Sequence, residues 1–337
     1  MRKRRRMTAL TRSLTRSLVS MARGMARSVA RPPKPPRAPS VAPRRPAAAA
    51  GRWLGGQVVG AAGTRRYRLY RPPGIRPDER LPLLVMLHGC SQDAAGFAAS
   101  TRMNQVALRE RFLVLYPEQS MSANRHGCWN WFDTDSGRAQ READLIVKAV
   151  DQVRLSQPVD SARMAVAGLS AGASMAALVA TRHPQHFRAV VMHSGIPPGA
   201  AHSALSALSA MQGRRTQHAA VSLPLAGQAP WPPLLVIHGD ADTVVSPRNA
   251  QAAVQLWAQA CGATAAGPRS VQRGKRHPMS VTDYRSGGRL RATQVDVTGL
   301  GHAWSGGAAS QPFSDGKGPD ASRMVWAFAA RQFPAGP

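Results

Sequence analysis

The sequence of 337 residues lacks features that several protein classes require. Its three cysteines are too few for a disulfide-rich scaffold or for a zinc ribbon. Its longest informative uncharged stretch, residues 164–181, just reaches the length of a membrane span, at about 18 residues, but consists largely of Ala, Gly and Ser. We therefore expect a soluble protein without a transmembrane helix.

Acidic residues are also scarce, with 17 Asp+Glu against 45 Lys+Arg and a net charge of +28. Such an excess suggests nucleic acid or an anionic surface as a partner. However, 40 of the basic residues are Arg and only 5 are Lys, beside abundant Ala, Gly and Pro, a composition that a GC-rich coding bias also produces. Nothing beyond residue 50 resembles a nucleic-acid-binding module, so no specific nucleic acid partner is expected.

Residues 1–50 differ from the rest, because they hold 14 basic residues and no acid. The pattern predicts an amphipathic basic helix, followed from Arg31 by a Pro-rich linker. Arginines interrupt its leucines, so it lacks the apolar core of a secretory signal. Three interpretations stay open: a disordered or wrongly assigned leader, a surface-binding helix, or a targeting leader. We predict a leader and linker over 1–50 and a folded domain over 51–337. The apolar residues at helical spacing are Met7, Leu10, Leu14, Leu18, Met21 and Met25.

From about residue 51, short apolar runs alternate with amphipathic segments. The runs that begin at residues 83, 164, 189 and 234 are continuously apolar, as expected for strands covered on both faces. This alternation predicts an α/β fold with a mainly parallel sheet and helices on both faces. Strands are predicted over 67–70, 83–87, 112–116, 164–167, 189–192, 234–237 and 293–297, and helices over 141–155, 170–182, 247–260 and 319–333.

A Gly-Leu-Ser-Ala-Gly motif at residues 168–172 follows one predicted strand and opens a predicted helix. A strand, a sharp turn and a helix in that order form the nucleophile elbow of α/β-hydrolases. Ser170 would then project from the carboxyl end of the sheet as a nucleophile. The alternative is an ordinary strand–helix turn, or a phosphate-binding loop without its lysine.

A serine nucleophile of this fold needs an acid and then a histidine later in the chain. Asp240 and Asp242 directly follow a predicted strand, where the active-site groups of such sheets gather. We predict Asp242 as the acid, because Val244 and Val245 would anchor the loop behind it, and Asp240 as the residue that holds the turn. His302 lies in a glycine-rich loop after the next strand and is predicted as the base, because histidine titrates near neutrality.

Another predicted buried strand ends in His88-Gly-Cys, which resembles the loop that supplies an oxyanion donor in α/β-hydrolases. We predict that the backbone N–H groups of Cys90 and Ala171 hold the oxyanion of a tetrahedral intermediate. His88 itself is expected to order this loop.

Eight blocks together resemble the poly(3-hydroxybutyrate) depolymerase family, which also includes feruloyl and acetylxylan esterases. The resemblance spans about residues 60–333 and implies an α/β-hydrolase fold, cleavage of hydroxyalkanoic or hydroxycinnamic esters, and no metal or other cofactor. It assigns the family's serine, acid and histidine to Ser170, Asp242 and His302. In chain order the blocks are His88-Gly-Cys-Ser-Gln, Asn104, Tyr116-Pro-Glu-Gln, Cys128-Trp-Asn-Trp-Phe, Gly168-Leu-Ser-Ala-Gly, His193-Ser-Gly, His238-Gly-Asp-Ala-Asp and Gly301-His-Ala-Trp.

Cys90 and Cys128 both stand in these blocks. The resemblance favours a disulfide between them, which would suit an extracellular protein, whereas two buried free thiols are the alternative. Cys261 is expected to stay unpaired. The surface of a cytoplasmic granule is the alternative location.

Trp129, Trp131 and Trp304 are candidates for the walls of an acyl pocket, although each would also suit the core. The leading hypothesis is a serine ester hydrolase acting on poly(3-hydroxybutyrate) or its oligomers, with a feruloyl or acetylxylan esterase as the alternative. A peptidase of the same fold is less favoured, because acids that would bind a substrate amine are scarce. The expected partners are the ester substrate and, through residues 1–50, a polyester or anionic surface.

Overall fold

A computed structural model describes residues 51–214, 224 and 229–335. The helix and linker predicted for residues 1–50 lie outside the described residues, so the domain boundary at residue 51 stays a prediction. Within the described part of the chain, no helix combines the length and the apolar character that a membrane span requires.

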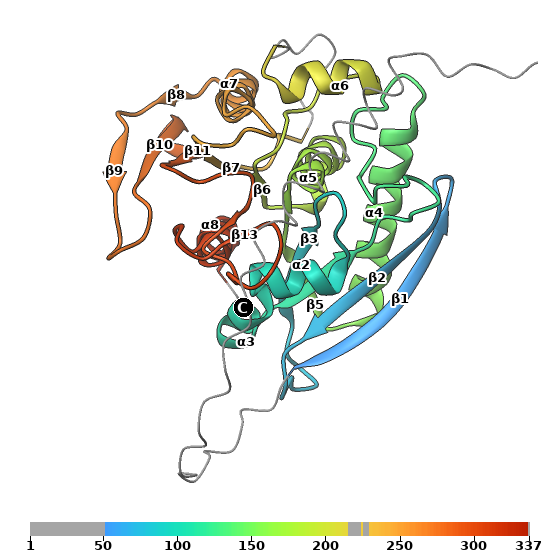
Figure 1. Ribbon diagram of the computed structural model, residues 1–337. Coiled ribbons are helices and arrows are strands. Elements are labelled where there is room, and N and C mark those ends of the chain that lie inside the picture. The colour runs from blue at the N-terminus through green and yellow to red at the C-terminus, as the bar shows by residue number, and fades with distance from the viewer. Residues whose placement is uncertain (1–50, 215–223, 225–228, 336–337) are drawn as a thin grey trace, which may run out of the picture. The chain divides into compact units, whose positions relative to one another are not determined.

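Eleven strands of the described residues form one mixed sheet (Figure 1). Its order is β1-β2-β4-β3-β5-β6-β7-β11-β10-β8, and β9 also pairs with β10. The pairings from β4 through β11 are parallel, whereas those at both edges are antiparallel. The strands are β1 Arg52–Gly60, β2 Gly63–Arg71, β3 Leu81–Leu87, β4 Leu113–Pro117, β5 Val159–Leu169, β6 Ala189–His193, β7 Leu234–Gly239, β8 Thr264–Ala265, β9 Arg269–Val271, β10 Met279–Ser286 and β11 Arg289–Val297.

Helices cover both faces of the sheet, as predicted. One core cluster joins the sheet to α4, α5, α6 and α7, and the other joins it to α2, α3 and α8. All seven residues of β3 are buried, and from Leu83 to Leu87 they alternate between the two clusters. The helices are α2 Ala94–Thr101, α3 Met103–Glu110, α4 Arg138–Ser156, α5 Ala171–Arg182, η2 Pro184–His186, α6 Ala204–Met211, α7 Arg248–Cys261 and α8 Ala321–Gln332, and a small second sheet pairs β12 Trp304–Ser305 with β13 Ser314–Asp315.

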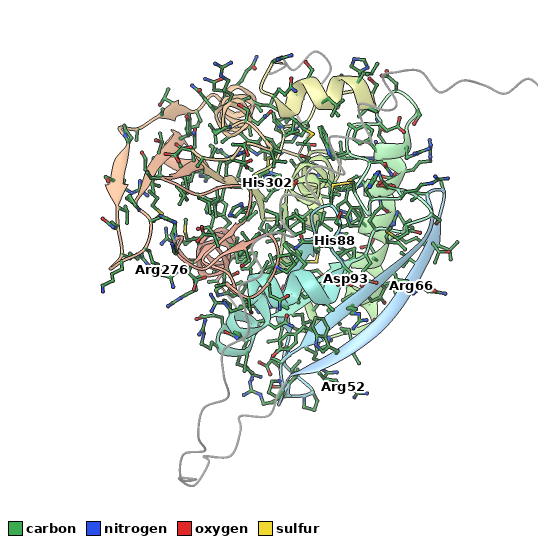
Figure 2. All side chains as sticks on the ribbon, viewed as in Figure 1. Arg52, Arg66, His88, Asp93, Arg276 and His302 are labelled. Atoms are coloured by element: carbon green, nitrogen blue, oxygen red, sulfur yellow. A yellow bond between two sulfur atoms is a disulfide. The ribbon has the colours of Figure 1, made fainter. Side chains whose placement is uncertain are left out.

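The parallel strands bring the predicted site residues to one edge of the sheet. Ser170 follows β5, Asp242 follows β7 and His302 follows β11, while His88 directly follows β3. Because parallel strands end at the same edge, these four segments converge there. His88 and His302 are labelled in Figure 2, on the segments that follow β3 and β11.

Candidate active site

Ser170 occupies a sharp turn between β5 and α5. Its backbone has φ 55° and ψ −122°, a conformation that residues other than glycine rarely adopt. The turn is held because Ser170 N–H donates to the His193 carbonyl of β6 at 2.9 Å, while the Ser170 carbonyl accepts from Ala173 N–H at 2.9 Å. A residue held at such angles costs on the order of 1–3 kcal/mol and points to a functional constraint.

The two glycines of the motif are required by close packing. A Cβ at Gly168 would lie 2.3 Å from the Gly172 backbone, and one at Gly172 would lie 2.2 Å from the Leu87 carbonyl oxygen. Helix α5 therefore begins directly against the end of β3. This contact sets Ser170 beside the His88-Gly89-Cys90 segment.

Ser170, His302 and Asp242 form a hydrogen-bonded chain. His302 Nε2 lies 2.9 Å from Ser170 Oγ, and His302 Nδ1 lies 2.8 Å from Asp242 Oδ2. Since a carboxylate only accepts, Nδ1 carries the hydrogen, and Nε2 is left to accept from the serine hydroxyl. In this tautomer His302 is placed to remove the proton of Ser170 as it attacks.

The Asp242 carboxylate is buried and well supplied with donors. Its Oδ1 accepts from the backbone N–H groups of Val244 and Val245, both at 2.9 Å, so these valines anchor the loop as predicted. Burial raises the pKa of Asp242, but hydrogen bonds from His238 and His302 outweigh burial and hold this pKa well below its ordinary value. Asp242 is thus kept ionised beside His302.

Asp240 has a different partner. Its Oδ1 accepts from Gly299 N–H at 2.7 Å, which ties the turn after β7 to the loop that carries His302. The structure therefore brings Asp242 to His302 and leaves Asp240 as a loop contact.

Two further histidines, His193 and His238, contact the hydrogen-bonded residues of the site. Neither was assigned a role at the site from the sequence. His238 Nε2 lies 3.3 Å from Asp242 Oδ2 and 2.9 Å from the Val245 carbonyl oxygen. His193 is fully buried, accepts from Ser305 N–H at 3.1 Å, and has its pKa lowered to about 3 by burial and by the nearby His238 and His302. Both lie in the motif blocks noted above, at strand ends, which is the one signal that would have found them.

The segment after β3 lies beside Ser170. A Cβ at Gly89 would be 3.6 Å from Ser170 Cβ. Within the described part of the chain, neither the Cys90 N–H nor the Ala171 N–H donates a hydrogen bond, so both donors are available. His88 orders this segment through a 2.8 Å contact of Nδ1 with the Gly89 carbonyl, and burial lowers the pKa of His88 to about 4.

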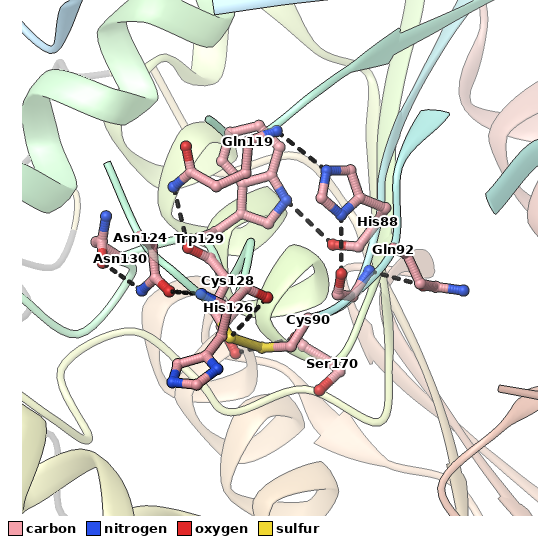
Figure 3. The surroundings of a disulfide bond; sticks show 12 residues. His88, Cys90, Gln92, Gln119, Asn124, His126, Cys128, Trp129, Asn130 and Ser170 are labelled. Atoms are coloured by element: carbon pink, nitrogen blue, oxygen red, sulfur yellow. Dashed lines mark hydrogen bonds between the residues drawn. A yellow bond between two sulfur atoms is a disulfide. The ribbon is translucent and has the colours of Figure 1, made fainter. Parts of the chain in front are cut away.

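A disulfide joins Cys90 to Cys128, with the two Cα atoms 4.2 Å apart (Figure 3). The bridge ties the proposed oxyanion segment to the loop that precedes Trp129. Ser91 N–H also donates to the His126 carbonyl at 2.9 Å. Cys261 is the free cysteine among the described residues.

Two of the three tryptophans predicted to line an acyl pocket belong to the core, which corrects that prediction. Trp129 and Trp304 have no exposed surface, because Trp129 packs against His88 and Trp304 stacks on His193 with ring centroids 4.9 Å apart. Trp131 keeps 9% of its surface exposed and meets Phe132 edge to face. Only Trp131 remains a candidate for substrate contact.

Several known proteins are similar to this chain. The sequence profile of the family described as Esterase PHB depolymerase matches residues 65–276. Poly(3-hydroxyalkanoate) depolymerase C of Paucimonas lemoignei is 33% identical over 228 residues, covering 66% of this chain and 54% of that protein. Acetylxylan esterase A of Emericella nidulans is 26% identical over 219 residues, covering 61% and 70% of the two chains.

The chain spans about half the length of the first curated relatives that it matches. Among solved structures, an acetyl xylan esterase from Aspergillus awamori superposes with a TM-score of 0.58 at 18% identity, over 82% of this chain and 99% of the other. This likeness confirms the predicted α/β-hydrolase fold.

Proposed function

The chain belongs to the Esterase PHB depolymerase family, and from this premise we propose that it hydrolyses carboxylic esters through an acyl-enzyme on Ser170. One observation carries the proposal: the hydrogen-bonded chain from Ser170 through His302 to Asp242, with the serine held at a strained turn. Serine hydrolases of unrelated folds share this arrangement of nucleophile, base and orienting acid.

The proposed reaction has two halves. Ser170 Oγ attacks the ester carbonyl carbon while its proton passes to His302 Nε2. The tetrahedral intermediate then collapses, the bond to the alcohol oxygen breaks, and His302 returns the proton to the leaving alcohol. Water repeats the sequence on the acyl-enzyme and releases the free acid. Asp242 stays ionised throughout and stabilises the imidazolium that forms twice.

The negative charge on the carbonyl oxygen needs donors in place before the attack. We assign this role to the N–H groups of Cys90 and Ala171, which have no partner among the described residues. The Ala171 N–H also stands at the amino end of α5, where the helix dipole favours an anion. One such donor is worth about 10²–10³ in turnover.

For the substrate we propose hydroxyalkanoate esters, namely poly(3-hydroxybutyrate) or its oligomers. The name of the 33% identical relative supports this choice. The names of other relatives favour a second candidate, an acetylxylan or feruloyl esterase. Trp131 is the proposed contact for the acyl group. Neither candidate requires a metal or another cofactor, and neither requires a nucleic acid partner.

We propose an extracellular location, because disulfides such as Cys90–Cys128 persist in oxidising compartments. Residues 1–50 would add a contact with a polyester or anionic surface. A cytoplasmic granule surface is the alternative, and it would suit the same basic leader.

The test compares the full chain with Ser170→Ala on p-nitrophenyl esters of increasing acyl length, methyl ferulate, acetylated xylan and a hydroxybutyrate oligomer. Wild-type turnover should be highest on the oligomer, and Ser170→Ala should lose about 10⁶-fold with an unchanged circular dichroism spectrum. Activity retained in Ser170→Ala would disprove the mechanism. A preference for methyl ferulate or acetylated xylan would be consistent with the proposed mechanism but would contradict the proposed hydroxyalkanoate substrate.

A further inference from the structure

A buried polar network contacts both segments that the Cys90–Cys128 disulfide joins. Resting on the esterase function proposed above, we infer that the Arg65–Glu142 ion pair is a positioning device for catalysis: it fixes the His88–Cys90 segment so that the Cys90 N–H meets the oxyanion.

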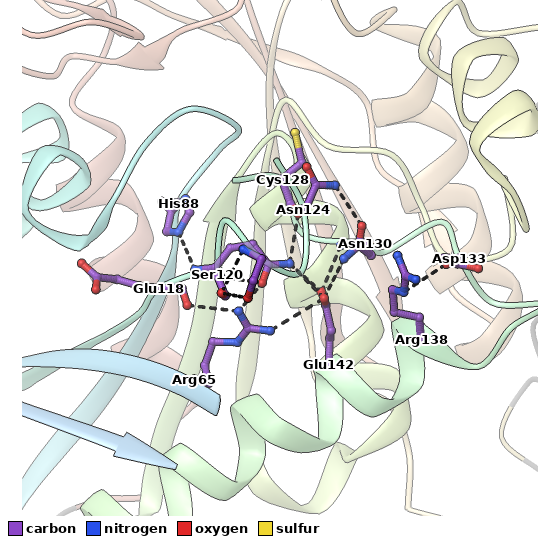
Figure 4. A network of polar contacts seen from close by, with 12 residues as sticks. Arg65, His88, Glu118, Ser120, Asn124, Cys128, Asn130, Asp133, Arg138 and Glu142 are labelled. Carbon is purple, nitrogen blue, oxygen red and sulfur yellow. Dashed lines mark hydrogen bonds and ion pairs between the residues drawn. The ribbon is translucent and has the colours of Figure 1, made fainter. Parts of the chain in front are cut away.

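Arg65 of β2 and Glu142 of α4 form a fully buried ion pair (Figure 4). Their side chains are 0% and 1% exposed, and Arg65 Nη2 lies 3.7 Å from Glu142 Oε1. Removing two charges from water is costly, so such a pair adds little stability over apolar residues of the same size. We therefore attribute the pair to geometric precision rather than to a gain in stability.

The Glu142 carboxylate gathers two side chains from the segment between β4 and α4. Its oxygens accept from Gln119 Nε2 at 2.9 and 3.0 Å, from Asn130 N–H at 3.0 Å and from Asn130 Nδ2 at 2.7 Å. Arg65 donates to the side-chain oxygen of Gln119 and to the Glu118 carbonyl. Both the oxygen and the nitrogen of the Gln119 amide thus have partners. A flipped amide would set its NH2 group against Arg65 and its oxygen against Glu142, so the side chain has one orientation.

From Gln119 and Trp129 the network reaches the oxyanion segment on two sides (Figures 3 and 4). Gln119 N–H donates to His88 Nε2 and Trp129 Nε1 donates to the His88 carbonyl, both at 3.0 Å. Gln119 Nε2 also donates to the Cys128 carbonyl at 3.0 Å, and Cys128 is bridged to Cys90. His88 and Cys90 are therefore both held by groups that Glu142 orders.

Neither charged residue touches the reacting atoms, so their action is indirect. A hydrogen bond to an oxyanion depends steeply on distance and angle. A small displacement of the Cys90 N–H would weaken the transition state more than the bound ester, because charge develops on the oxygen only during attack. The expected signature is a loss in kcat with little change in KM.

The experiment compares wild type with Glu142→Gln on a soluble p-nitrophenyl ester. We expect kcat to fall about 10- to 100-fold, less than the loss of a whole donor, while KM changes less than about twofold. The affinity for a trifluoromethyl ketone, which forms a tetrahedral adduct on Ser170, should fall by the same factor as kcat. The matched control is Asp144→Asn on the same helix, whose exposed carboxylate pairs with Arg182 and His183 and should leave kcat unchanged.

A double variant separates positioning from stability. Arg65→Met with Glu142→Gln removes the unpaired buried charge, so it should regain the melting temperature that the single variant loses, but not its kcat. If Glu142→Gln does not fold, Asn130→Ala removes one hydrogen bond to Glu142 without unpairing a charge, and it should lower kcat about 3- to 10-fold.

Three results would overturn the inference. They are an unchanged kcat in Glu142→Gln or, where that variant does not fold, in Asn130→Ala; a rise in KM alone; and a double variant that regains kcat together with its melting temperature. A wild-type protein without esterase activity would instead remove the proposed function on which the inference rests, so the two failures are distinguishable.

Discussion

Asp240 and Asp242 stand two residues apart, but their carboxylates have different partners. Asp242 contacts His302 Nδ1, whereas Asp240 accepts from Gly299 N–H. We predict that Asp242→Asn lowers kcat/KM by about 10⁴-fold, because an amide favours the wrong imidazole tautomer. Asp240→Asn should cost less than about tenfold, because its amide oxygen can still accept from Gly299. Steady-state kinetics on p-nitrophenyl acetate would measure both.

Melting temperatures control for this comparison, since neither variant should lose its folded structure. If Asp240→Asn were the more damaging change while both proteins remained folded, the assignment of the acid would be wrong.

The proposed catalytic residues could be predicted from the sequence, because their order along the chain and their positions after strands identify them. Ser170, Asp242 and His302 each follow a strand, and the fold requires that chain order. The surroundings of the tryptophans could not be predicted in this way. Whether Trp304 faces a substrate or the core depends on His193 and Phe97, which the chain brings to it from far away. A sequence motif indicates that a residue has a role, but it does not show which distant residues pack against its side chain.

At the scale of whole elements, the buried parallel strands were the most predictable. Strands β3, β5, β6 and β7 have continuous apolar runs, which only strands covered on both faces need. Strands β1 and β10 were not predicted from the sequence, because they lie toward the edges of the sheet and are partly exposed. The glycines of β1 and the polar residues of β10 interrupt any continuous apolar run. The Arg65–Glu142 pair was missed for a related reason, since a charged residue on an exposed-looking strand gives no sign of burial.

The Cys90–Cys128 bridge joins two loops and closes a sequence separation of 38 residues. We predict that replacing both cysteines by serine lowers the free energy of unfolding by about 3–4 kcal/mol, because the unfolded chain is no longer constrained. Urea unfolding of the oxidised wild type and of the double variant would measure this difference.

Thiol counting provides an independent check. The folded, oxidised protein should react with one equivalent of alkylating reagent, at Cys261, and the reduced, unfolded protein with three. Cys261→Ser serves as the matched variant and should change stability by less than about 1 kcal/mol. Three reactive thiols in the folded, oxidised protein would rule out the bridge and weaken the extracellular proposal.

For the molecule as a whole, the buried histidines predict a loss of stability on the acid side. Burial lowers the pKa of His88 to about 4 and that of His193 to about 3, from an ordinary value of 6.5. Between about pH 6.5 and 4 the unfolded chain therefore binds protons that the folded chain does not. As the pH decreases through this range, the free energy of unfolding should decrease by up to about 1.4 kcal/mol per pH unit for each histidine.

Urea unfolding at pH 7, 6 and 5 would measure this slope. His193→Gln should reduce the slope. The Asp242 carboxylate adds little slope in this range, because its depressed pKa gives a stabilisation that is complete above its ordinary pKa of 3.8 and is lost only below it. Equal slopes in wild type and His193→Gln would contradict the assignment of acid sensitivity to the buried histidines.

At the scale of the whole molecule, we propose that surface binding and catalysis belong to different parts of the chain. Residues 1–50 carry 14 basic residues and no acid, while every proposed catalytic group lies between Cys90 and His302. Each basic side chain near an anionic membrane contributes roughly 1 kcal/mol, an interaction that salt screens. Binding to a surface and turnover should therefore respond differently to removal of the leader.

We predict that a chain beginning at residue 51 keeps its kcat and KM on a soluble p-nitrophenyl ester, because no proposed site residue is removed. It should lose salt-sensitive sedimentation with anionic vesicles and with polyester particles, which the full chain should show at low ionic strength and lose near 1 M salt, where the screening length is about 3 Å. Neutral vesicles are the control for non-specific sedimentation. A folded but inactive shortened chain would mean that residues 1–50 contribute to the active site, and the boundary at residue 51 would be wrong.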